Sequence, residues 1–480
     1  MDEMAANSME SKIGSIKTEE AVFIRKRTEN SGGYDVFSLE ENVEDGRPAF
    51  NLARIQTTDV APDLLNGLLV EQVPEYLRSS PSRKLHVLVS TGAGTGCALA
   101  FYEAALRPLL DALGFASSEG GNGPSAQAES DNRGNRYNLV ITKDAQSIRR
   151  FVQDLNEDAP EQEAIETDHT VILLSGDGGI VELLNGKAPT DGGSRTQIRT
   201  PLVAVLPLGT GNALFSSLHK PVKAAGGPAA RSSGLVQGLR TLLTGTAAQL
   251  PSFGAAFSPG SRLITYMSAD GEEADKAEER ADAVSHLRGA IVASYGFHSQ
   301  LVWESDTPAC RAHGAKRFGM VAQELLRESH AYSAEVEITR PGKKERERVE
   351  RDRHAYVLAT LVSNLEETFT ISPASRPLDG RLRLVHFGDV GGQRTMDIMT
   401  RAYDGGKHVD MAGEGGGGPE ERVGYDEIAE VRVTTLERDP RWRKVCVDGT
   451  IVEIPQGGSM TVTMEEEAHL RILVDRSIVS

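Results

Sequence analysis

Several features that would identify common protein classes are scarce or absent in this sequence. Only three of its 480 residues are cysteine, and no two of them form a CxxC pair. Such sparse cysteine argues against a disulfide framework or a zinc site and favours a reducing compartment. No segment approaches the roughly 18 consecutive apolar residues of a membrane-spanning helix. The N-terminus also lacks the positively charged start and the apolar core of a secretory signal.

Positive charge is in short supply as well. The chain has 52 Lys and Arg residues against 69 Asp and Glu residues, which gives a formal net charge of −17. An acidic surface argues against a nucleic-acid-binding protein. An anionic ligand would therefore be held locally, by a few basic side chains, by backbone N–H groups or by a metal ion.

The sequence pattern predicts two different domains after an N-terminal extension. We read residues 1–80 as the extension, with short strands at 22–25 and 36–39. Residues 81–246 alternate apolar runs with helical stripes, which indicates βαβ units on a parallel sheet with helices on both faces. Residues 247–480 are β-rich, and their last strands either stay in this domain or return to the first. The predicted fold is therefore α/β plus β: a three-layer domain with a parallel sheet, then a β-sandwich-like domain.

Individual elements can be predicted within each domain. The first domain has apolar runs at 85–90, 138–142, 170–174 and 202–206, and helices at 97–113, 148–155 and 180–185. We expect strands in the second domain at 263–267, 290–294, 334–338, 356–362, 382–387, 428–433, 444–447 and 460–464, and helices at 315–328 and 396–403. The glycine-rich segments 117–136 and 405–424 have few apolar residues, which is typical of mobile loops.

Three glycine-rich turns each follow a predicted strand and begin a helix. They lie at residues 91–96, 175–179 and 207–212, and we call them the first, second and third glycine turns. In a parallel sheet all three lie at the carboxyl edge, where ligands bind. Glycines let backbone N–H groups approach a phosphate, and a helix N-terminus favours negative charge. One such turn is weak evidence, but three consecutive turns predict a phosphate or nucleotide site. The first turn matches neither a Walker loop nor a Rossmann fingerprint.

Asp177 lies inside the second glycine turn. A carboxylate among phosphate-binding N–H groups is suited to bind a metal ion or to accept the proton of a hydroxyl group. The alternative is that Asp177 caps the helix that follows. We favour a catalytic role.

The motifs resemble those of the sphingosine kinase and diacylglycerol kinase family. The resemblance extends over roughly residues 81–465, with five motifs in the family's order. Residues 175–186 resemble the GDG…E..NG signature, 207–214 the second nucleotide loop, 295–318 the substrate-domain signature, and 378–380 and 447–449 the two late DG turns.

This resemblance implies a lipid kinase that uses ATP and Mg²⁺. The nucleotide would lie on the glycine turns, and a sphingoid base, diacylglycerol or related lipid alcohol would approach from the second domain. Asp177 matches the residue that orients the lipid hydroxyl and accepts its proton. Residues expected at the nucleotide are Ser90, Thr91, Gly94, Gly96, Thr142, Ser175, Gly176, Gly178, Glu182, Gly209, Thr210, Gly211, Asn212, Arg311 and Arg317. Asp448 and Asp379 match metal-associated positions of the family.

Some of these residues also have a plainer interpretation. Arg311 and Arg317 either supply charge to the ATP phosphates or belong to a solvated helix face. Phe297, Leu301 and Val302 either line an acyl channel or pack in the core.

The sequence departs from the family's pattern at three places. Ser90-Thr91 stands where the family has Asn-Pro, and Thr450 stands where its late DGE motif has Glu. Val302 stands where an acidic residue contacts the sphingoid amine, which favours a neutral lipid alcohol. Two alternatives therefore stay open. One is a non-catalytic lipid- or nucleotide-binding module on the same fold, and the other is a kinase for a soluble substrate such as NAD.

The expected location is cytoplasmic, with peripheral attachment to a membrane surface. The basic and acidic segment 340–353 is either a solvated hairpin or a dock for anionic headgroups. We expect a lipid substrate and no nucleic-acid partner, and the sequence does not specify an oligomeric state.

Overall fold

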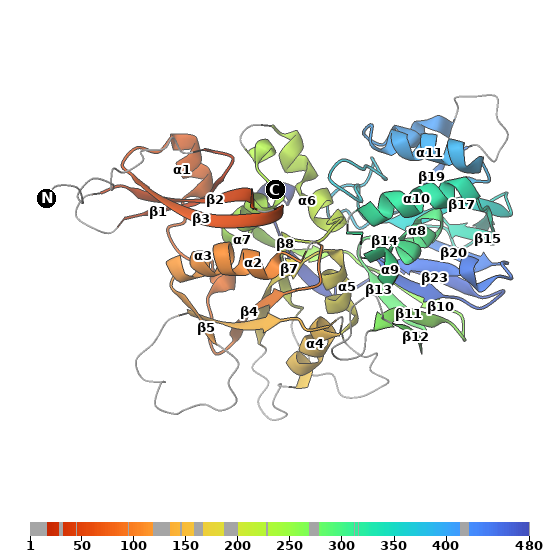
Figure 1. Cartoon of the computed structure of the whole chain (residues 1–480), viewed down its shortest axis with the longest axis horizontal. Helices are drawn as coiled ribbons and strands as arrows, with labels where there is room; N and C mark the ends of the chain where they lie inside the picture. The colour runs from red at the N-terminus through yellow and green to blue at the C-terminus, as the bar shows by residue number, and fades with distance from the viewer. Residues whose placement is uncertain are drawn as a thin grey trace, which may run out of the picture.

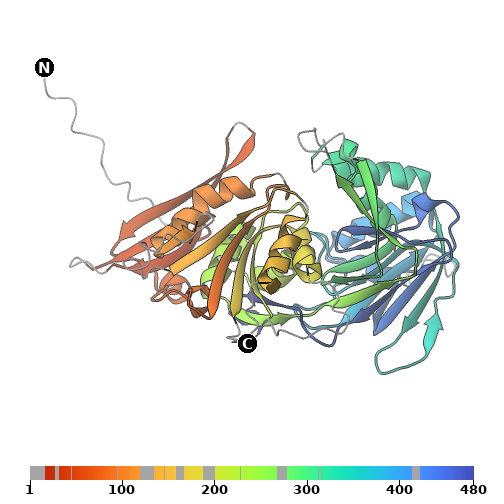
Figure 2. The same ribbon diagram turned by 90° about the horizontal axis from the view of Figure 1, so that it is seen from below.

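The computed structural model describes residues 17–479 apart from 28–31, 45, 95, 119–134, 145, 158–166, 187–199, 227–228, 268–277, 312, 315 and 413–421. Of the two predicted loops, 117–136 and 405–424, residues 119–134 and 413–421 lie outside the described residues, and residues 407–412 of the second form a 3₁₀-helix instead of a loop. The described part contains three sheets that follow one another along the molecule (Figure 1, Figure 2). We call them the N-terminal sheet, the parallel-sheet domain and the antiparallel-sheet domain.

The N-terminal sheet is antiparallel, in the order β1-β2-β3. The rings of Phe23 and Phe37 stack on its inner face with centroids 4.3 Å apart, and they share a core with helix α7 of the next domain. Arg240 of that helix donates hydrogen bonds to the backbone oxygens of Thr18 and Ala21. The region before residue 80 is thus packed onto the parallel-sheet domain. Its elements are β1 (Ala21–Lys26), β2 (Tyr34–Glu44), β3 (Arg47–Thr57), α1 (Pro62–Leu68) and η1 (Glu75–Leu77).

The parallel-sheet domain has seven strands in the order β5-β6-β4-β7-β8-β24-β9. All neighbours are parallel except β24 and β9. The central strands are apolar and buried on both faces, as parallel strands covered by helices must be. The strands are β4 (Arg83–Val89), β5 (Phe115–Ser118), β6 (Asn135–Ile141), β7 (Asp168–Ser175), β8 (Leu202–Pro207), β9 (Thr246–Leu250) and β24 (Leu470–Val474).

Helices cover both faces of this sheet. Those around α2, α3 and α7 share one core with the N-terminal sheet, and those around α4, α5 and α6 share another with the antiparallel-sheet domain. The segment predicted as one helix at 97–113 forms two α-helical pieces joined by a π-helical turn. The helices are α2 (Ala98–Phe101), η2 (Tyr102–Leu106), α3 (Arg107–Ala112), α4 (Ser147–Glu157), α5 (Asp177–Asn185), α6 (Ala213–Ala224), η3 (Ala229–Arg231) and α7 (Gly234–Thr244).

The antiparallel-sheet domain is built on a single connected sheet of 14 strands. The sheet curls, and helices α8, α10 and α11 gather on one side of it (Figure 1). Its strands are β10 (Phe253–Phe257), β11 (Arg262–Met267), β12 (Glu278–Ala283), β13 (His286–Gly289), β14 (Val292–Gly296), β15 (Tyr332–Thr339), β16 (Arg346–Arg348), β17 (Arg353–Thr360), β18 (Leu382–Gly388), β19 (Gly424–Ile428), β20 (Glu430–Thr435), β21 (Lys444–Val447), β22 (Thr450–Glu453) and β23 (Ser459–Met464). Its helices are α8 (Phe297–Ser305), α9 (Pro308–Arg311), α10 (Lys316–Glu328), α11 (Gly391–Ala402), η5 (Lys407–Ala412) and η7 (Pro440–Trp442).

The predicted fold class, α/β followed by a β-rich domain, is confirmed. Two predicted strands have different bounds for a physical reason. The strand expected at 290–294 begins only at Val292, because the N–H groups of Ala290 and Ile291 donate to the Asp448 carboxylate. The strand expected at 428–433 is interrupted at Ala429, whose N–H donates to Thr339 instead.

No helix among the described residues is long and apolar enough to span a membrane.

Candidate active site at the carboxyl edge of the parallel sheet

The three glycine turns meet at one edge of the parallel sheet. A Cβ atom on Gly176 would lie 2.7 Å from the Cα of Gly209, and a Cβ atom on Gly94 would overlap the carbonyl oxygen of Leu208. The Leu208 N–H donates to the Ser175 carbonyl oxygen over 3.1 Å. Side chains at these two glycines would push the turns apart, so this local arrangement requires glycine.

The first glycine turn is tied to strand β6. The Thr91 N–H donates to Thr142 Oγ1 over 3.0 Å, and the Thr91 hydroxyl donates to the Thr142 carbonyl oxygen over 2.9 Å. The Ser90 N–H continues the ladder to Leu174. Thr142 is thus brought beside the first turn, as expected from its place at the end of its strand.

The third glycine turn is locked by Asn212, which has a left-handed backbone (φ 50°) at the start of helix α6. Its Oδ1 accepts the Gly209 N–H over 3.0 Å, and its Nδ2 donates to the Gly209 carbonyl oxygen over 2.9 Å. Thr210 is exposed and Gly211 is half-buried between these two residues. The side chain of Asn212 therefore shapes the turn itself.

Asp177 joins two helices at this edge. It is the first residue of α5, and its carboxylate accepts the N–H groups of Ala213 (2.7 Å) and Leu214 (3.1 Å) at the start of α6. Asp177 thus does cap a helix, although it caps α6 and not its own α5. Burial raises the pKa of Asp177 above its usual value, and the two N–H donors oppose this rise. Each oxygen keeps a lone pair for a further ligand or a proton.

Glu182 lies one helical turn beyond, half-buried on α5. Burial is the main cause that raises its pKa to about 7; Arg149 lowers this pKa and Asp144 raises it. A carboxyl group beside the glycine turns therefore ionises near neutral pH.

Asp448 reaches the same region from the antiparallel-sheet domain. It is 5% exposed, its φ is 47°, and its carboxylate accepts the N–H groups of Ala290 (2.6 Å), Ile291 (3.0 Å) and Val292 (2.6 Å). Burial raises its pKa to about 7, and the negative charge of Asp177 adds to the rise. The two carboxylates are therefore close enough to interact. Because both oxygens of Asp448 are occupied by backbone donors, its geometry is that of a clamp on residues 290–292.

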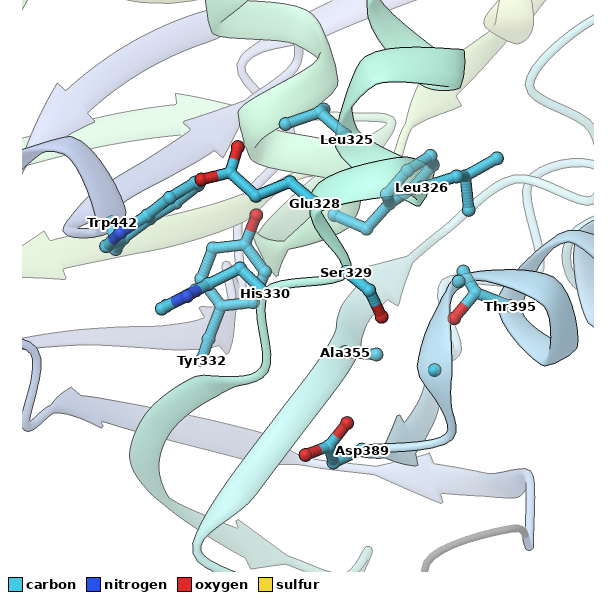
Figure 3. Close-up of a pocket in the computed structure, with 13 residues that line it drawn as sticks. Leu325, Leu326, Glu328, Ser329, His330, Tyr332, Ala355, Asp389, Thr395 and Trp442 are labelled. Carbon is cyan, nitrogen blue, oxygen red and sulfur yellow. The ribbon is translucent and has the colours of Figure 1, made fainter.

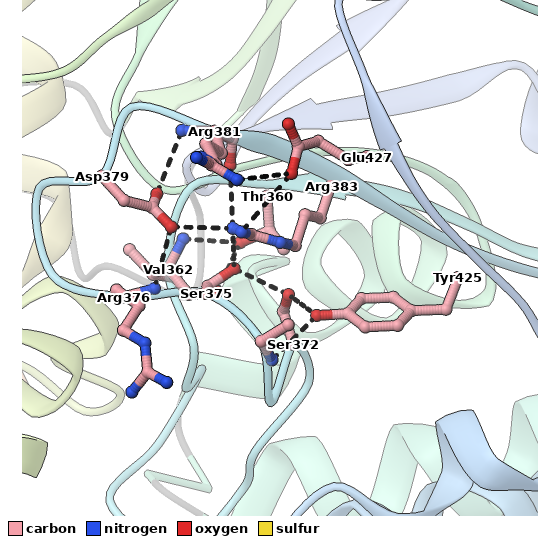
Figure 4. A network of polar contacts seen from close by, with 11 residues as sticks. Thr360, Val362, Ser372, Ser375, Arg376, Asp379, Arg381, Arg383, Tyr425 and Glu427 are labelled. Atoms are coloured by element: carbon pink, nitrogen blue, oxygen red, sulfur yellow. Dashed lines mark hydrogen bonds and ion pairs between the residues drawn. The ribbon is translucent and has the colours of Figure 1, made fainter. Parts of the chain in front are cut away.

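Asp379 lies in a different network, whose members among the described residues belong to the antiparallel-sheet domain. Its carboxylate accepts the N–H groups of Arg376 and Arg381 and forms a 3.0 Å ion pair with Arg383, which is 8% exposed (Figure 4). Glu427 completes the network on the other side of the guanidinium. Arg383 supplies positive charge opposite Asp379 in this structure, and the metal role of Asp379 stays a prediction.

At this edge of the sheet, Asp177 is the carboxylate whose geometry fits a Mg²⁺ ligand. Within the described part of the chain, no group of three or more His, Cys, Asp or Glu side chains is arranged to hold a metal ion. Mg²⁺ in kinase sites commonly uses one or two carboxylates together with substrate phosphates and water. The half-buried Asp177, with its remaining lone pairs, fits such a role, whereas the enclosed Asp448 does not fit it in this geometry.

Arg311 and Arg317 lie on α9 and α10 of the antiparallel-sheet domain. Arg311 forms a bidentate pair with Asp306 at 2.6 and 3.0 Å, and Arg317 is 3.9 Å from the same carboxylate and lies over the Phe318 ring. Among the described residues, neither guanidinium forms a hydrogen bond or ion pair with the glycine turns. The partners of both guanidinium groups thus lie within the antiparallel-sheet domain, and their contact with ATP phosphates stays a prediction.

The three apolar residues expected at the substrate share helix α8 but contact different clusters. Phe297 lines a small pocket with Leu325, Tyr332 and Trp442, and Figure 3 labels the last three. Leu301 packs against the core of the curled sheet. Val302 packs beside Ile264, Cys446 and Ile451.

Other residues of this edge had no local signal in the sequence. Arg149 lies near Glu182, and Lys220 of α6 donates to Asn364 from the antiparallel-sheet domain over 2.9 Å. Lys220 and Asn364 are 144 positions apart, so no spacing along the chain indicates the contact.

Comparisons with known proteins were made against families and solved structures. Residues 120–238, which hold the second and third glycine turns, match the family model of the diacylglycerol kinase catalytic domain. No curated protein matches the chain in sequence. Two crystal structures of proteins assigned as diacylglycerol kinases from Bacillus anthracis str. Sterne are 14% and 15% identical to the chain. Each has a TM-score of 0.47 and covers 83% of this chain and 100% of its own. Over residues 120–238, and thus over its second and third glycine turns, the chain is similar to the diacylglycerol kinase catalytic domain family.

Proposed function

We propose that this protein is an ATP-dependent lipid kinase that transfers the γ-phosphate of ATP to the hydroxyl group of a lipid alcohol. The observation that carries the proposal is the meeting of three glycine turns around Asp177, at the N-termini of α5 and α6. The family whose model matches residues 120–238 consists generally of kinases that use ATP. In this proposal residues 81–246 bind nucleotide, with β24 completing their sheet, and residues 247–480 bind the lipid.

Phosphoryl transfer requires positioning and charge stabilisation more than covalent help from the protein. The backbone of the second and third turns and the positive end of α6 stabilise the phosphates. The lipid hydroxyl oxygen forms a bond to the γ-phosphorus while the bond from that phosphorus to the β–γ bridging oxygen breaks, which leaves ADP. Asp177 orients the hydroxyl and accepts its proton.

Mg²⁺ bound to ATP supplies positive charge that offsets the charge of the transferred phosphoryl group. Asp177 is the residue that would hold it here. Ser90, Thr91, Thr142, Ser175 and Glu182 remain proposed nucleotide contacts. Arg311 and Arg317 would reach the phosphates only after leaving Asp306, and Asp448 and Asp379 are assigned to the metal by family resemblance alone.

The surroundings of Val302 favour a neutral acceptor. Its neighbours Ile264, Cys446 and Ile451 are apolar, and a sphingoid amine placed there would lose its water without gaining a carboxylate partner. We therefore place diacylglycerol or a related neutral alcohol ahead of sphingosine.

The ion pairs of segment 340–353 favour a solvated hairpin over a dock for lipid headgroups. Its arginines are paired with acidic side chains: Arg340 with Glu347 and Asp426, Arg346 with Glu430, and Arg348 with Glu335 and Asp352. Peripheral membrane contact and a cytoplasmic location stay part of the proposal.

The test is the transfer of labelled phosphate from Mg-ATP to mixed micelles that contain diacylglycerol, ceramide or sphingosine. We expect a labelled neutral lipid with the wild-type chain and none with Asp177→Ala, while ATP binding is retained. Asp63→Ala, an exposed change on α1, is the matched control and should leave transfer unchanged. Retained ATP binding without any labelled product would favour a binding module, and label in the aqueous phase would favour a soluble acceptor. A preference for sphingosine would contradict the argument from Val302.

A further inference from the structure

Two hydrogen-bonded ties cross from the helices that hold Asp177 to the antiparallel-sheet domain. The first starts at Asn185, the last residue of α5, and the second at Ser217 and Lys220 of α6. Both helices contact the Asp177 carboxylate or contain it. The position of the second domain is thus fixed through the elements that carry the proposed base.

The first tie joins the end of α5 to strand β13. Asn185 Nδ2 donates to the Arg288 carbonyl oxygen, and the Arg288 N–H donates back to Asn185 Oδ1, both over 2.8 Å. Nδ2 also donates to the Val181 carbonyl oxygen over 2.9 Å. The amide thus uses both of its donors and its oxygen, which is the pattern expected of a side chain that fixes a register.

Residues 288–292 run from the last two residues of β13 through the buried Ala290 and Ile291 to the first residue of β14, and we call them the seam segment. Asn185 holds its first N–H from one domain, and Asp448 holds the N–H groups of residues 290–292 from the other. Ala290 and Ile291 are 1% and 2% exposed and pack in a core that includes Ile180 and Leu184 of α5. The seam segment therefore connects Asp177 to Asp448 through a single helix and one asparagine.

The second tie joins α6 to residues 361–371. The Ser217 hydroxyl donates to the Asn364 carbonyl oxygen over 3.1 Å and accepts the Asn364 N–H over 2.9 Å. Lys220 Nζ donates to Asn364 Oδ1 over 2.9 Å. The carbonyl oxygen of Leu365 then passes close to Gly211, where a Cβ atom would be 3.4 Å away. This loop of the lipid-binding half thus lies directly on the third glycine turn.

We propose that Asn185 is a positioning residue that sets the register of the seam segment against α5, and through it the place of the acceptor hydroxyl relative to Asp177. This inference rests on the proposed kinase function. The side chain of Asn185 forms its hydrogen bonds with Val181 and Arg288, so its loss should leave the nucleotide bound but let the acceptor move. Water then reaches the γ-phosphate more often, and ATP is hydrolysed without lipid phosphorylation.

The first experiment measures amide hydrogen exchange on the full-length chain without ligands, comparing wild type with Asn185→Leu. Leucine is close to asparagine in size but leaves the Arg288 N–H without a partner. We expect exchange in residues 286–292 to be faster by about tenfold, as for the loss of one buried hydrogen bond. Asn51→Leu is the matched control, because Asn51 donates one 2.8 Å bond to Glu40 in the exposed N-terminal sheet. It should leave exchange at 286–292 unchanged. Unchanged exchange in Asn185→Leu would overturn the inference whatever the activity.

The second experiment measures ADP and labelled lipid together. For Asn185→Leu we expect kcat for the lipid to fall about tenfold or more, KM for ATP to stay within about twofold, and ADP formed per labelled lipid to rise. Asn185→Asp keeps an acceptor for Arg288 and should be intermediate in exchange and in coupling. A proportional loss of ATP binding and transfer, with the ADP-to-lipid ratio unchanged, would reduce Asn185 to a structural residue. If the wild type transfers no phosphate to any lipid, the proposed function fails, whereas the exchange result still decides whether the tie exists.

Discussion

At the residue scale, two acidic side chains each accept hydrogen bonds from several backbone N–H groups. Asp177 accepts two N–H groups at the start of α6, and Asp448 accepts three from residues 290–292. A carboxylate is a stronger hydrogen-bond acceptor than a neutral side chain. Asp177 and Asp448 therefore each order a backbone segment whose N–H groups donate to the carboxylate and not to a neighbouring strand. Their charges are also coupled, since Asp177 contributes to the raised pKa of Asp448.

Replacing Asp448 with asparagine tests the clamp. The amide nitrogen of Asn cannot accept an N–H, so Asp448→Asn should lower the free energy of unfolding by about 1–3 kcal/mol. The raised pKa means that the folded chain binds this proton more tightly than the unfolded chain. The contribution of Asp448 to stability is thus largest below its ordinary pKa of 3.8 and falls as pH rises towards about 7. Urea unfolding between about pH 4 and 7 should show a smaller pH slope in the variant; an equal slope would exclude this role.

The same coupling predicts a shift in the pH dependence of catalysis. A base must be unprotonated, so kcat should rise with pH through the pKa of Asp177, which burial raises above the usual carboxyl range. Asp448→Asn removes a neighbouring negative charge and should move this rise to lower pH. A pH–rate profile with saturating substrates measures the midpoint of this rise in the wild type and in the variant. An unmoved acidic limb would show that the two carboxylates act independently.

At the element scale, the glycine turns depend on backbone-to-backbone contact. Gly209→Ala would drive a Cβ into the Cα of Gly176 and against Asn212 Oδ1. We expect ATP binding to weaken by at least about tenfold and stability to fall by roughly 1–3 kcal/mol. Gly67→Ala on α1, where a Cβ meets nothing within 4 Å, serves as the control. Calorimetric titration with ATP that gave equal affinities for Gly209→Ala and wild type would contradict this packing argument.

The elements also show how far sequence reasoning reached. Strands with continuous apolar runs, such as β4, β7 and β18, could be predicted because burial of both faces leaves a local signature. Strands β9 and β12 were missed, since TAAQL and EERADA contain small or charged residues and are strands only because of their neighbours. The three glycine turns could also be predicted, because their glycines are close together in the sequence. The donors to Asp448 and the partner of Asn185 lie more than 100 positions away, so only the fold reveals them.

At the scale of the whole molecule, the two domains are interleaved. Strand β24 comes after all of the antiparallel sheet, yet it lies between β8 and β9 of the parallel sheet. Its side chains Leu470, Ile472, Leu473 and Val474 are at most 3% exposed. The parallel-sheet domain is therefore incomplete without a segment that follows the antiparallel sheet in the chain.

A chain that ends at residue 469 should lose the parallel-sheet domain. The four side chains above are worth roughly 1.5–3 kcal/mol each, which together rivals the 5–15 kcal/mol that stabilises a typical domain. We expect limited proteolysis to cut first within residues 81–250 and ATP binding to disappear. A chain that ends at residue 478 keeps β24 and should behave as the full-length protein. Unchanged ATP binding in the shorter chain would refute the role given to β24.

The position of β24 in the chain also means that the parallel sheet is completed late during synthesis. From Leu250, where β9 ends, to Leu470, where β24 begins, the ribosome must add 220 residues. At 5–20 residues per second this takes roughly 10 to 45 s. During that time β8 and β9 have no partner between them, and their open edges are exposed to chaperones and to other nascent chains. The parallel sheet can therefore close only after this five-residue strand has been synthesised.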